Sequence, residues 1–115
     1  MPDKEEDHDP RKRLNLCGIH LRRLRLEKHL TLVDIQATLE LDYGIILDRT
    51  NLGRIENGER TVTDVELAVF AQLLGVPVEH LLWGETSPDA DLLGKTLKNV
   101  ELRYAARRPK KIKGA

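Results

Sequence analysis

The chain has 115 residues, with 19 basic and 19 acidic side chains, so its formal net charge is zero. That length suits one domain. Aromatic residues are scarce, with one Trp, one Phe and two Tyr, so the core must be built from Leu, Ile, Val and Ala. Because apolar residues recur at helical spacing and strand-like alternation is missing, the sequence predicts an all-α protein.

Two classes of protein are excluded by composition and hydropathy. Cys17 is the single cysteine, so no intrachain disulfide can form, and we expect it to be a small buried apolar residue. No apolar run approaches the roughly 18 residues of a membrane span, and no signal-peptide pattern is present. We therefore expect a soluble protein that stays inside the cell.

The charges are unevenly spread along the chain. Residues 14–86 carry seven bases and eleven acids, whereas residues 103–115 carry six bases and no acid. Three of the seven bases, Arg49, Arg54 and Arg60, fall within residues 49–60. A net-acidic domain argues against nucleic-acid binding, because phosphate contacts supply most non-specific affinity. The local group of bases argues for it, so charge alone leaves that question open.

The chain begins with a polar, charged stretch that contains two prolines, residues 1–13, and this composition predicts a disordered N-terminal arm. A first helix is expected from Leu14 to His29. Its buried face has apolar residues at helical spacing, namely Cys17, Leu21 and Leu24.

Capping residues define the next two helices. Thr31 is an expected N-cap, with Asp34 completing a capping box, and Gly44 is an expected stop for the second helix. Residues 45–47 form a short apolar connector. Asp48 is then a good N-cap for a third helix over 49–57, which Asn57-Gly58 ends.

Two further helices follow in the same way. Thr63 and Glu66 form a second capping box, which opens a fourth helix that ends at Gly75. A brief fifth helix is expected over Val78 to Trp83, ended by Gly84.

A C-terminal amphipathic helix is predicted over residues 87–107, with Ser87 as N-cap and Pro88 at the first helical position. Its apolar stripe has spacings of four, three and four residues, and consists of Leu93, Leu97, Val100 and Tyr104. This spacing is typical of a helix that needs an apolar partner, either its own domain or a second copy. Residues 108–115 then form a basic tail that we expect to be disordered, either solvated or bound to DNA phosphates.

The helix over 49–57 has two different faces. Leu52 and Ile55 can pack into a small core, while the opposite face is polar and basic. That face carries Arg49, Thr50, Asn51 and Arg54. Such a helix suits the major groove of DNA, although an ordinary solvated face has the same composition.

Three segments, in this order, carry a resemblance to a known family: Leu21 to Thr31, the sequence Arg-Ile-Glu-Asn-Gly at 54–58, and Leu73 to Leu82. Together they resemble the lambda-repressor-like helix-turn-helix regulators of the Cro and Xre type. The resemblance runs from Gly18 to Gly84 and implies a five-helix DNA-binding domain over residues 14–84. It also implies a homodimer on double-stranded DNA, no cofactor, and a location in the cytoplasm with the nucleoid.

The resemblance also assigns roles to single residues. The expected base-reading residues are Arg49, Thr50, Asn51 and Arg54. The expected phosphate contacts are Thr31, Asn57, Arg60 and Thr61, of which Thr31 and Asn57 can serve equally as helix caps. Arg25 and Glu56 match a structural ion pair between the first and third helices.

Two features depart from the family pattern. Residues 40–45 look like an insertion of about six residues, which we expect to lengthen the second helix by a turn and to widen the link to the third. In addition, Leu32 stands where many members have a phosphate-binding Gln.

Catalysis and metal binding find no support in the sequence. The four His residues and Cys17 have no metal-ligand spacing, and no nucleophile with a neighbouring base is evident. We therefore expect a non-enzymatic, sequence-specific DNA-binding transcriptional regulator, a repressor, with 87–107 as a dimerisation or docking helix. The alternative is a helix-turn-helix module that binds a protein partner, such as an antitoxin or assembly factor, and does not read DNA.

Overall fold

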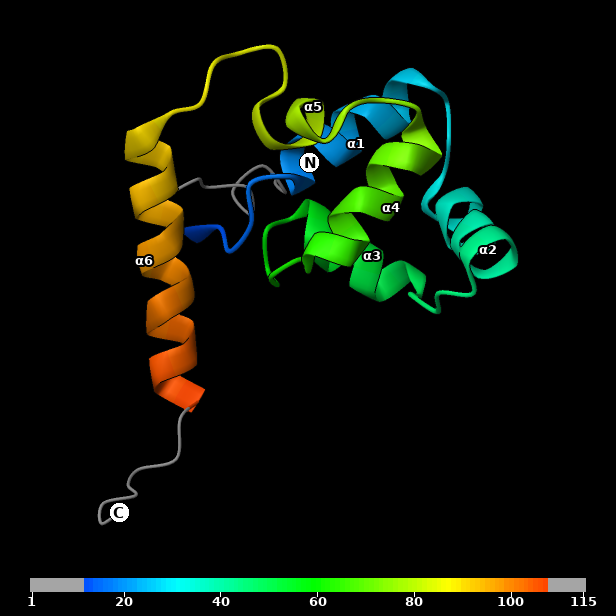
Figure 1. The fold of residues 1–115 in the computed structure, drawn as a ribbon. Coiled ribbons are helices and arrows are strands. Elements are labelled where there is room, and N and C mark those ends of the chain that lie inside the picture. The colour runs from blue at the N-terminus through cyan, green and yellow to red at the C-terminus, as the bar shows by residue number, and fades with distance from the viewer. Residues whose placement is uncertain (1–11, 108–115) are drawn as a thin grey trace, which may run out of the picture.

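The computed structural model describes residues 12–107, and the expected disorder of 1–11 and 108–115 lies outside these residues. The described chain forms six helices and no strand: α1 (Gly18–Glu27), α2 (Leu32–Tyr43), α3 (Arg49–Glu56), α4 (Asp64–Leu74), α5 (Val78–Trp83) and α6 (Ala90–Arg107). The predicted all-α fold is confirmed. Helices α1 to α5 pack together, whereas α6 lies along one side of them (Figure 1). Between residues 12 and 107, no helix is both long and apolar enough to cross a membrane.

Local capping chemistry sets the ends of α2 and α4. Thr31 Oγ1 accepts a hydrogen bond from the Asp34 amide while Asp34 accepts one from the Thr31 amide, and Thr63 and Glu66 repeat this arrangement. Gly44 and Gly75 end these helices in the left-handed conformation, with φ of 68° and 72°, which costs glycine no steric penalty. Both predicted capping boxes are confirmed.

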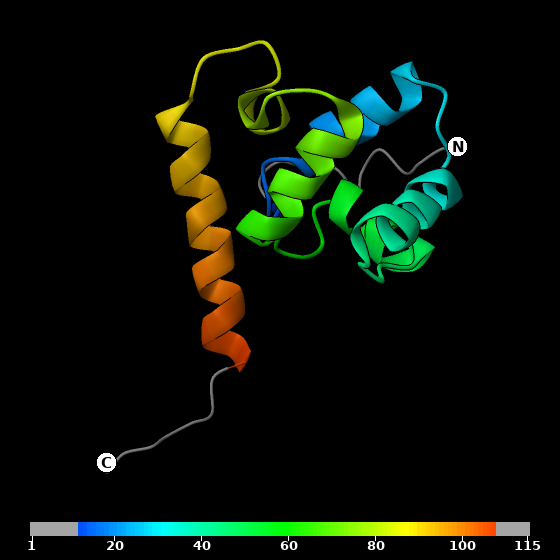
Figure 2. The ribbon, with the colours of Figure 1, turned by 45° about the vertical axis from the view of Figure 1, so that its right-hand side comes forward.

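The core lies where α1 to α5 meet, and Figure 2 shows the arrangement of these helices from a second side. It is aliphatic except for one aromatic ring. Its most completely buried side chains are Leu21, Leu39, Leu52, Ile55, Phe70, Leu74 and Leu81. Cys17 is buried beside them, and burial raises the pKa of its thiol to about 11, as expected for a packing residue in an apolar site.

The segment before α1 differs from the prediction. Helix α1 begins at Gly18 rather than Leu14, because Asn15 Oδ1 accepts a hydrogen bond from the Gly18 amide at 2.8 Å. The same side chain donates through Nδ2 to the carbonyls of Ile55, at 3.0 Å, and Arg60, at 2.9 Å. A helix continued back to Leu14 would not direct this side chain across the end of α3.

Two neighbours of Asn15 bind the same end of α3. The Leu14 amide donates to the Gly58 carbonyl at 2.8 Å, and the Arg13 guanidinium donates to the Glu56 carbonyl at 2.8 Å. Arg13, which the sequence placed in the arm, is only 3 % exposed. Residues 13–15 thus donate hydrogen bonds to carbonyls at and just after the C-terminal end of α3, where the intrahelical donors run out.

Helix α6 begins two residues later than predicted. Asp89, rather than Ser87, is the cap, because its Oδ1 accepts from the amides of Asp91, at 3.0 Å, and Leu92, at 3.2 Å. The helix docks on its own domain through a face that includes Thr96, which is 7 % exposed, and Asn99, whose Nδ2 donates to the Arg13 carbonyl at 2.8 Å.

The predicted apolar stripe of α6 is not the docked face. Leu93, Leu97 and Tyr104 remain 44 %, 59 % and 52 % exposed, and Val100 is half-buried at the edge of the contact. Val100 and Tyr104 line a cavity together with Leu14 and Leu67, whereas Leu93 and Leu97 stay on the exposed side of α6.

Replacing Asn15 by Ala is expected to lower the free energy of unfolding by about 2–3 kcal/mol, because three hydrogen bonds of about 1 kcal/mol each are lost. Urea denaturation measures this change. Asn51→Ala is the matched control, since Asn51 lies on the outer side of α3, and a change within about 0.5 kcal/mol is expected there. Equal losses in the two variants would contradict the role given to Asn15.

Candidate nucleic-acid interface

The two faces of α3 separate as the sequence predicts. Leu52, Ile55 and Glu56 are buried, at 1 %, 0 % and 3 % exposure. The opposite side holds the expected base-reading residues, of which Arg49 and Thr50 are exposed and Asn51 and Arg54 half-buried. The structure thus brings these four side chains onto one accessible surface of a single short helix.

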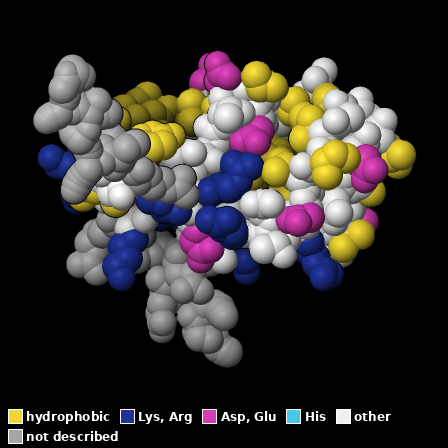
Figure 3. Space-filling view, turned by 90° about the horizontal axis from the view of Figure 1, so that it is seen from below, with side chains coloured by type: hydrophobic (Ala, Val, Ile, Leu, Met, Phe, Trp, Pro, Cys, Tyr) yellow, Lys and Arg dark blue, Asp and Glu magenta, His cyan; other side chains and the backbone are white. Residues whose placement is uncertain are grey.

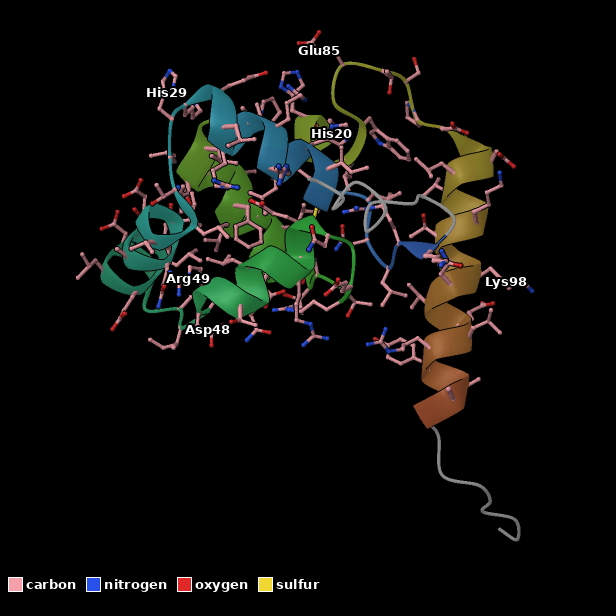
Figure 4. The ribbon with its side chains drawn as sticks, turned by 180° about the vertical axis from the view of Figure 1, so that it is seen from behind. His20, His29, Asp48, Arg49, Glu85 and Lys98 are labelled. Carbon is pink, nitrogen blue, oxygen red and sulfur yellow. The ribbon has the colours of Figure 1, made fainter. Side chains whose placement is uncertain are left out.

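A carboxylate begins α3. Asp48 Oδ1 accepts a hydrogen bond from the Asn51 amide at 2.8 Å, as an N-cap does. Figure 4 shows Asp48 and Arg49 side by side at this end of the helix. The cap satisfies a free amide and places a negative charge beside Arg49, so this end of α3 is less positive than its basic residue suggests.

A buried ion pair holds α3 against α1. Arg25 Nε lies 2.7 Å from Glu56 Oε2, and a second guanidinium nitrogen lies 3.0 Å from Glu56 Oε1. The remaining nitrogen donates to the Leu30 carbonyl at 2.8 Å. The planar fork of Arg matches the two carboxylate oxygens, so this pair fixes how far α3 can rotate about its own axis.

The four expected phosphate residues have different surroundings. Thr31 is exposed, but its hydroxyl is engaged in the cap with Asp34, and the hydrogen bonds from Thr31 hold the pKa of the Asp34 carboxyl below its ordinary value. Asn57 follows α3 as its C-cap, and Thr61 is half-buried. Thr31 stands at the start of α2, away from the other three in sequence.

Arg60 is engaged within the fold. Its guanidinium lies 3.0 Å from Glu66 Oε2 and 3.2 Å from Oε1, and it donates to the Thr61 carbonyl at 2.6 Å. Burial raises the pKa of Glu66, but the hydrogen bonds from Arg60 and Thr63 outweigh it, so the net shift is downward. A phosphate at Arg60 would have to displace this carboxylate.

Two basic residues of this surface, Lys12 and Arg103, were not predicted from the sequence. Lys12 and Arg103 line one cleft of about 390 Å³ together with Arg54 and Asn57 at the end of α3, and Glu59 is the carboxylate in its lining. Seen from the side of α3, Lys and Arg side chains gather near the middle of the molecule (Figure 3). No local sequence pattern indicates that Lys12 and Arg103 share a cleft, because they are far apart in the sequence. Only the docking of α6 brings Arg103 to Lys12.

The α2 side of the interface has a different character. Leu41, in α2, is 82 % exposed and Ile46, in the link to α3, is 73 % exposed, and the exposed acids Glu40 and Asp42 flank Leu41. Helix α2 runs to Tyr43, so most of the expected insertion at 40–45 is helical. Residues 40–46 therefore present an apolar and acidic surface, and the basic surface lies toward α6.

Gly53 has an unusual place in the middle of α3. Apart from the neighbouring residues and backbone of α3 itself, a Cβ atom added there would meet no atom within 4 Å. A close approach of α2 is thus not the reason for a glycine here. Glycine within a helix costs roughly 1 kcal/mol relative to Ala, and no packing in the described chain offsets that cost.

The fold and this surface define a helix-turn-helix protein, the class to which many DNA-binding regulators belong. The family described as "Helix-turn-helix domain" matches residues 17–83, more than half of the chain. The chain belongs to this family. No curated protein and no solved structure gave a match. Within residues 12–107, no three or more His, Cys, Asp or Glu side chains are grouped so that they could hold a metal ion.

Gly53→Ala is expected to raise the free energy of unfolding by about 0.5–1 kcal/mol, because the helix gains propensity and the new methyl group meets open space. Gly58→Ala is the contrasting variant. Gly58 has a φ of +76°, and Arg13 Cζ lies 2.7 Å from the added Cβ. The free energy of unfolding of this variant should therefore fall by at least about 1–2 kcal/mol. Urea denaturation measures both, and destabilisation by Gly53→Ala would show that α3 does not tolerate a side chain there.

Proposed function

We propose that this protein is a sequence-specific regulator of transcription that binds double-stranded DNA with α3 in the major groove. One observation carries the proposal. Arg49, Thr50, Asn51 and Arg54 share the accessible side of α3, while the opposite side is buried and tied to α1 through Glu56. A short helix held rigidly from behind presents its outer side chains in a fixed geometry, which direct base reading requires.

The chemistry of these side chains suits base edges. An Arg can donate two hydrogen bonds to guanine, an Asn can pair with adenine through both groups of its amide, and a Thr methyl can touch the methyl of thymine. We assign these roles to Arg49 and Arg54, to Asn51 and to Thr50. Phosphate contacts from Thr31, Asn57 and Thr61, and from Arg60 once a phosphate has displaced the Glu66 carboxylate, would fix the register on the duplex.

Gly53 supports the same orientation. It lies between the base-reading residues, and the space beside it is empty in the protein alone. A glycine that lowers helix stability without a packing reason is understandable where DNA approaches the helix backbone closely. Gly53→Ala is therefore expected to weaken DNA binding although it stabilises the domain.

We further propose that two copies bind together as a repressor. The exposed apolar residues of α6, Leu93, Leu97 and Tyr104, supply the contact between copies. Two α3 helices would then enter successive major grooves about 34 Å apart. A dimer bound over a promoter would block transcription by occupying it, so repression would need no further surface.

A second function is favoured by one observation. The exposed Leu41 and Ile46 lie among acids on the α2 side, as in a surface that binds a protein partner, such as the toxin of an antitoxin or a component of an assembly. In that case the chain would have kept the fold without reading DNA. Selection experiments distinguish the two functions.

Selection of bound sequences from a random duplex pool should enrich one motif, and its affinity should fall steeply with salt. Arg54→Ala should then cost roughly 1–3 kcal/mol on the enriched duplex and relax discrimination at one base pair. Gly53→Ala is measured on the same duplex. An absence of binding at low salt would exclude the regulator and support the protein-binding module, and unchanged affinity of Arg54→Ala would remove that residue from the base-reading set.

Light scattering should give the mass of a dimer for the full chain, and Leu97→Glu should convert it to a monomer by placing a charge in the apolar contact. Leu102→Glu is the matched control, because Leu102 is 62 % exposed on α6 but lies outside the stripe. A monomeric wild-type chain, or equal effects of both substitutions, would rule out dimerisation through this stripe.

A further inference from the structure

A cleft at the C-terminal end of α3 joins three parts of the chain that are distant in sequence. Lys12 comes from the segment before α1, Arg54 and Asn57 from the end of α3, and Arg103 from α6. Lys12 and Arg103 both lie outside residues 17–83, which the helix-turn-helix family covers. The family match therefore assigns no role to these two residues.

The cleft has the charge of an anion site. Among the residues that line it, three cations face one carboxylate, that of Glu59. Glu59 Oε1 is 4.0 Å from Arg54 Nε, and the two side chains are 48 % and 43 % exposed. A pair so long and so exposed contributes little stability, so at low cost Arg54 can leave Glu59 for a base edge and an anion can take the place of the carboxylate in the cleft.

The cleft also lies on the right side of the molecule. Arg54 belongs both to the outer face of α3 and to the lining of the cleft. Helix α6 runs past the level of α3 and ends on that side of the domain in both ribbon views (Figures 1 and 2).

We propose that this cleft binds a backbone phosphate of duplex DNA, next to the groove that α3 enters, so that α6 is part of the DNA-binding surface. The inference rests on the proposed DNA binding but not on base reading. The Arg103 guanidinium offers paired donors to the phosphate oxygens and Lys12 offers a compact charge, while the Asn57 amide is a neutral donor. Phosphate contacts of this kind set register rather than sequence preference.

The docking of α6 brings Arg103 to the site. Asn99, one turn before Arg103, donates its hydrogen bond to the Arg13 carbonyl, and Arg13 follows Lys12. A single hydrogen bond between backbone and side chain thus aligns the two cations that come from opposite ends of the chain.

The test compares two charge-neutralised proteins in salt titrations on the selected duplex and on a random-sequence duplex. The double variant Lys12→Gln, Arg103→Gln removes the cations of the cleft. Lys98→Gln is the control on the same helix, because Lys98 is exposed and points away from the domain (Figure 4). The slope of log affinity against log salt should fall by about 1 in the double variant, since one phosphate contact accounts for roughly 0.9, and should be unchanged in the control.

The reduction should be the same on both duplexes, and the enriched motif should not change. The charge-conserving variant Lys12→Arg, Arg103→Lys should keep the wild-type slope, and thermal unfolding should confirm that every variant is folded. A double variant with the slope of Lys98→Gln, or a control that loses as much as the double variant, would overturn the proposal. Saturable binding of inorganic phosphate at constant ionic strength, with an unaltered DNA slope, would also overturn it.

Failure here is distinguishable from failure of the proposed function. If the wild-type chain binds neither duplex at low salt, DNA binding itself is wrong. If it binds both duplexes alike, base reading by α3 is wrong, and the salt slope still tests the phosphate site.

Discussion

The pairing of Arg25 with Glu56 is the interaction on which the rest of the structure depends. Helix α3 has eight residues, too few to be stable in water by itself, so its place must come from tertiary contacts. Two aliphatic side chains bury one side of it, but apolar contacts alone permit a range of rotations. The bidentate ion pair restricts that rotation, and removal of either partner would leave a buried charge that costs on the order of 3–5 kcal/mol. The orientation of the outer face therefore depends on a residue of α1.

The carbonyls at the end of α3 impose a second constraint. Residues 13–15 donate to the carbonyls of Ile55, Glu56 and Gly58, and a Cβ on Gly18 would lie too close to the Ile55 carbonyl oxygen. The segment before α1 therefore crosses the C-terminal end of α3 and holds it through hydrogen bonds. Helix α6 contacts the same segment, because Asn99 donates to the Arg13 carbonyl. The positions of α6 and α3 therefore depend on each other. The five-helix fold and its additional helix form one connected structure through a few hydrogen bonds.

Helix ends were largely predictable because caps are local in sequence. Thr31 with Asp34, Thr63 with Glu66, and the glycines at 44 and 75 identify their helices within a few residues. Long-range partners were not predictable in the same way. Asn15 looks like a poor helix former in a helical pattern, and nothing near it indicates that it binds Arg60. Lys12 and Arg103 lie in one cleft only because of the way α6 docks. The apolar stripe of α6 did not predict that docking, because most of it stays exposed.

The net acidity of the domain is compatible with DNA binding because the charges are separated along α3. Asp48 lies at the start of this helix, and the cleft with Lys12 and Arg103 lies at its end. Eight residues at 1.5 Å each span about 12 Å, which exceeds the Debye length of about 8 Å at physiological salt. Acids on the α2 side are thus largely screened from a phosphate at the α6 side. The same separation disfavours a duplex that lies across α2 and favours one whose backbone passes between α3 and α6. The acidic side therefore opposes non-specific contact and also restricts how a duplex can be oriented on the domain.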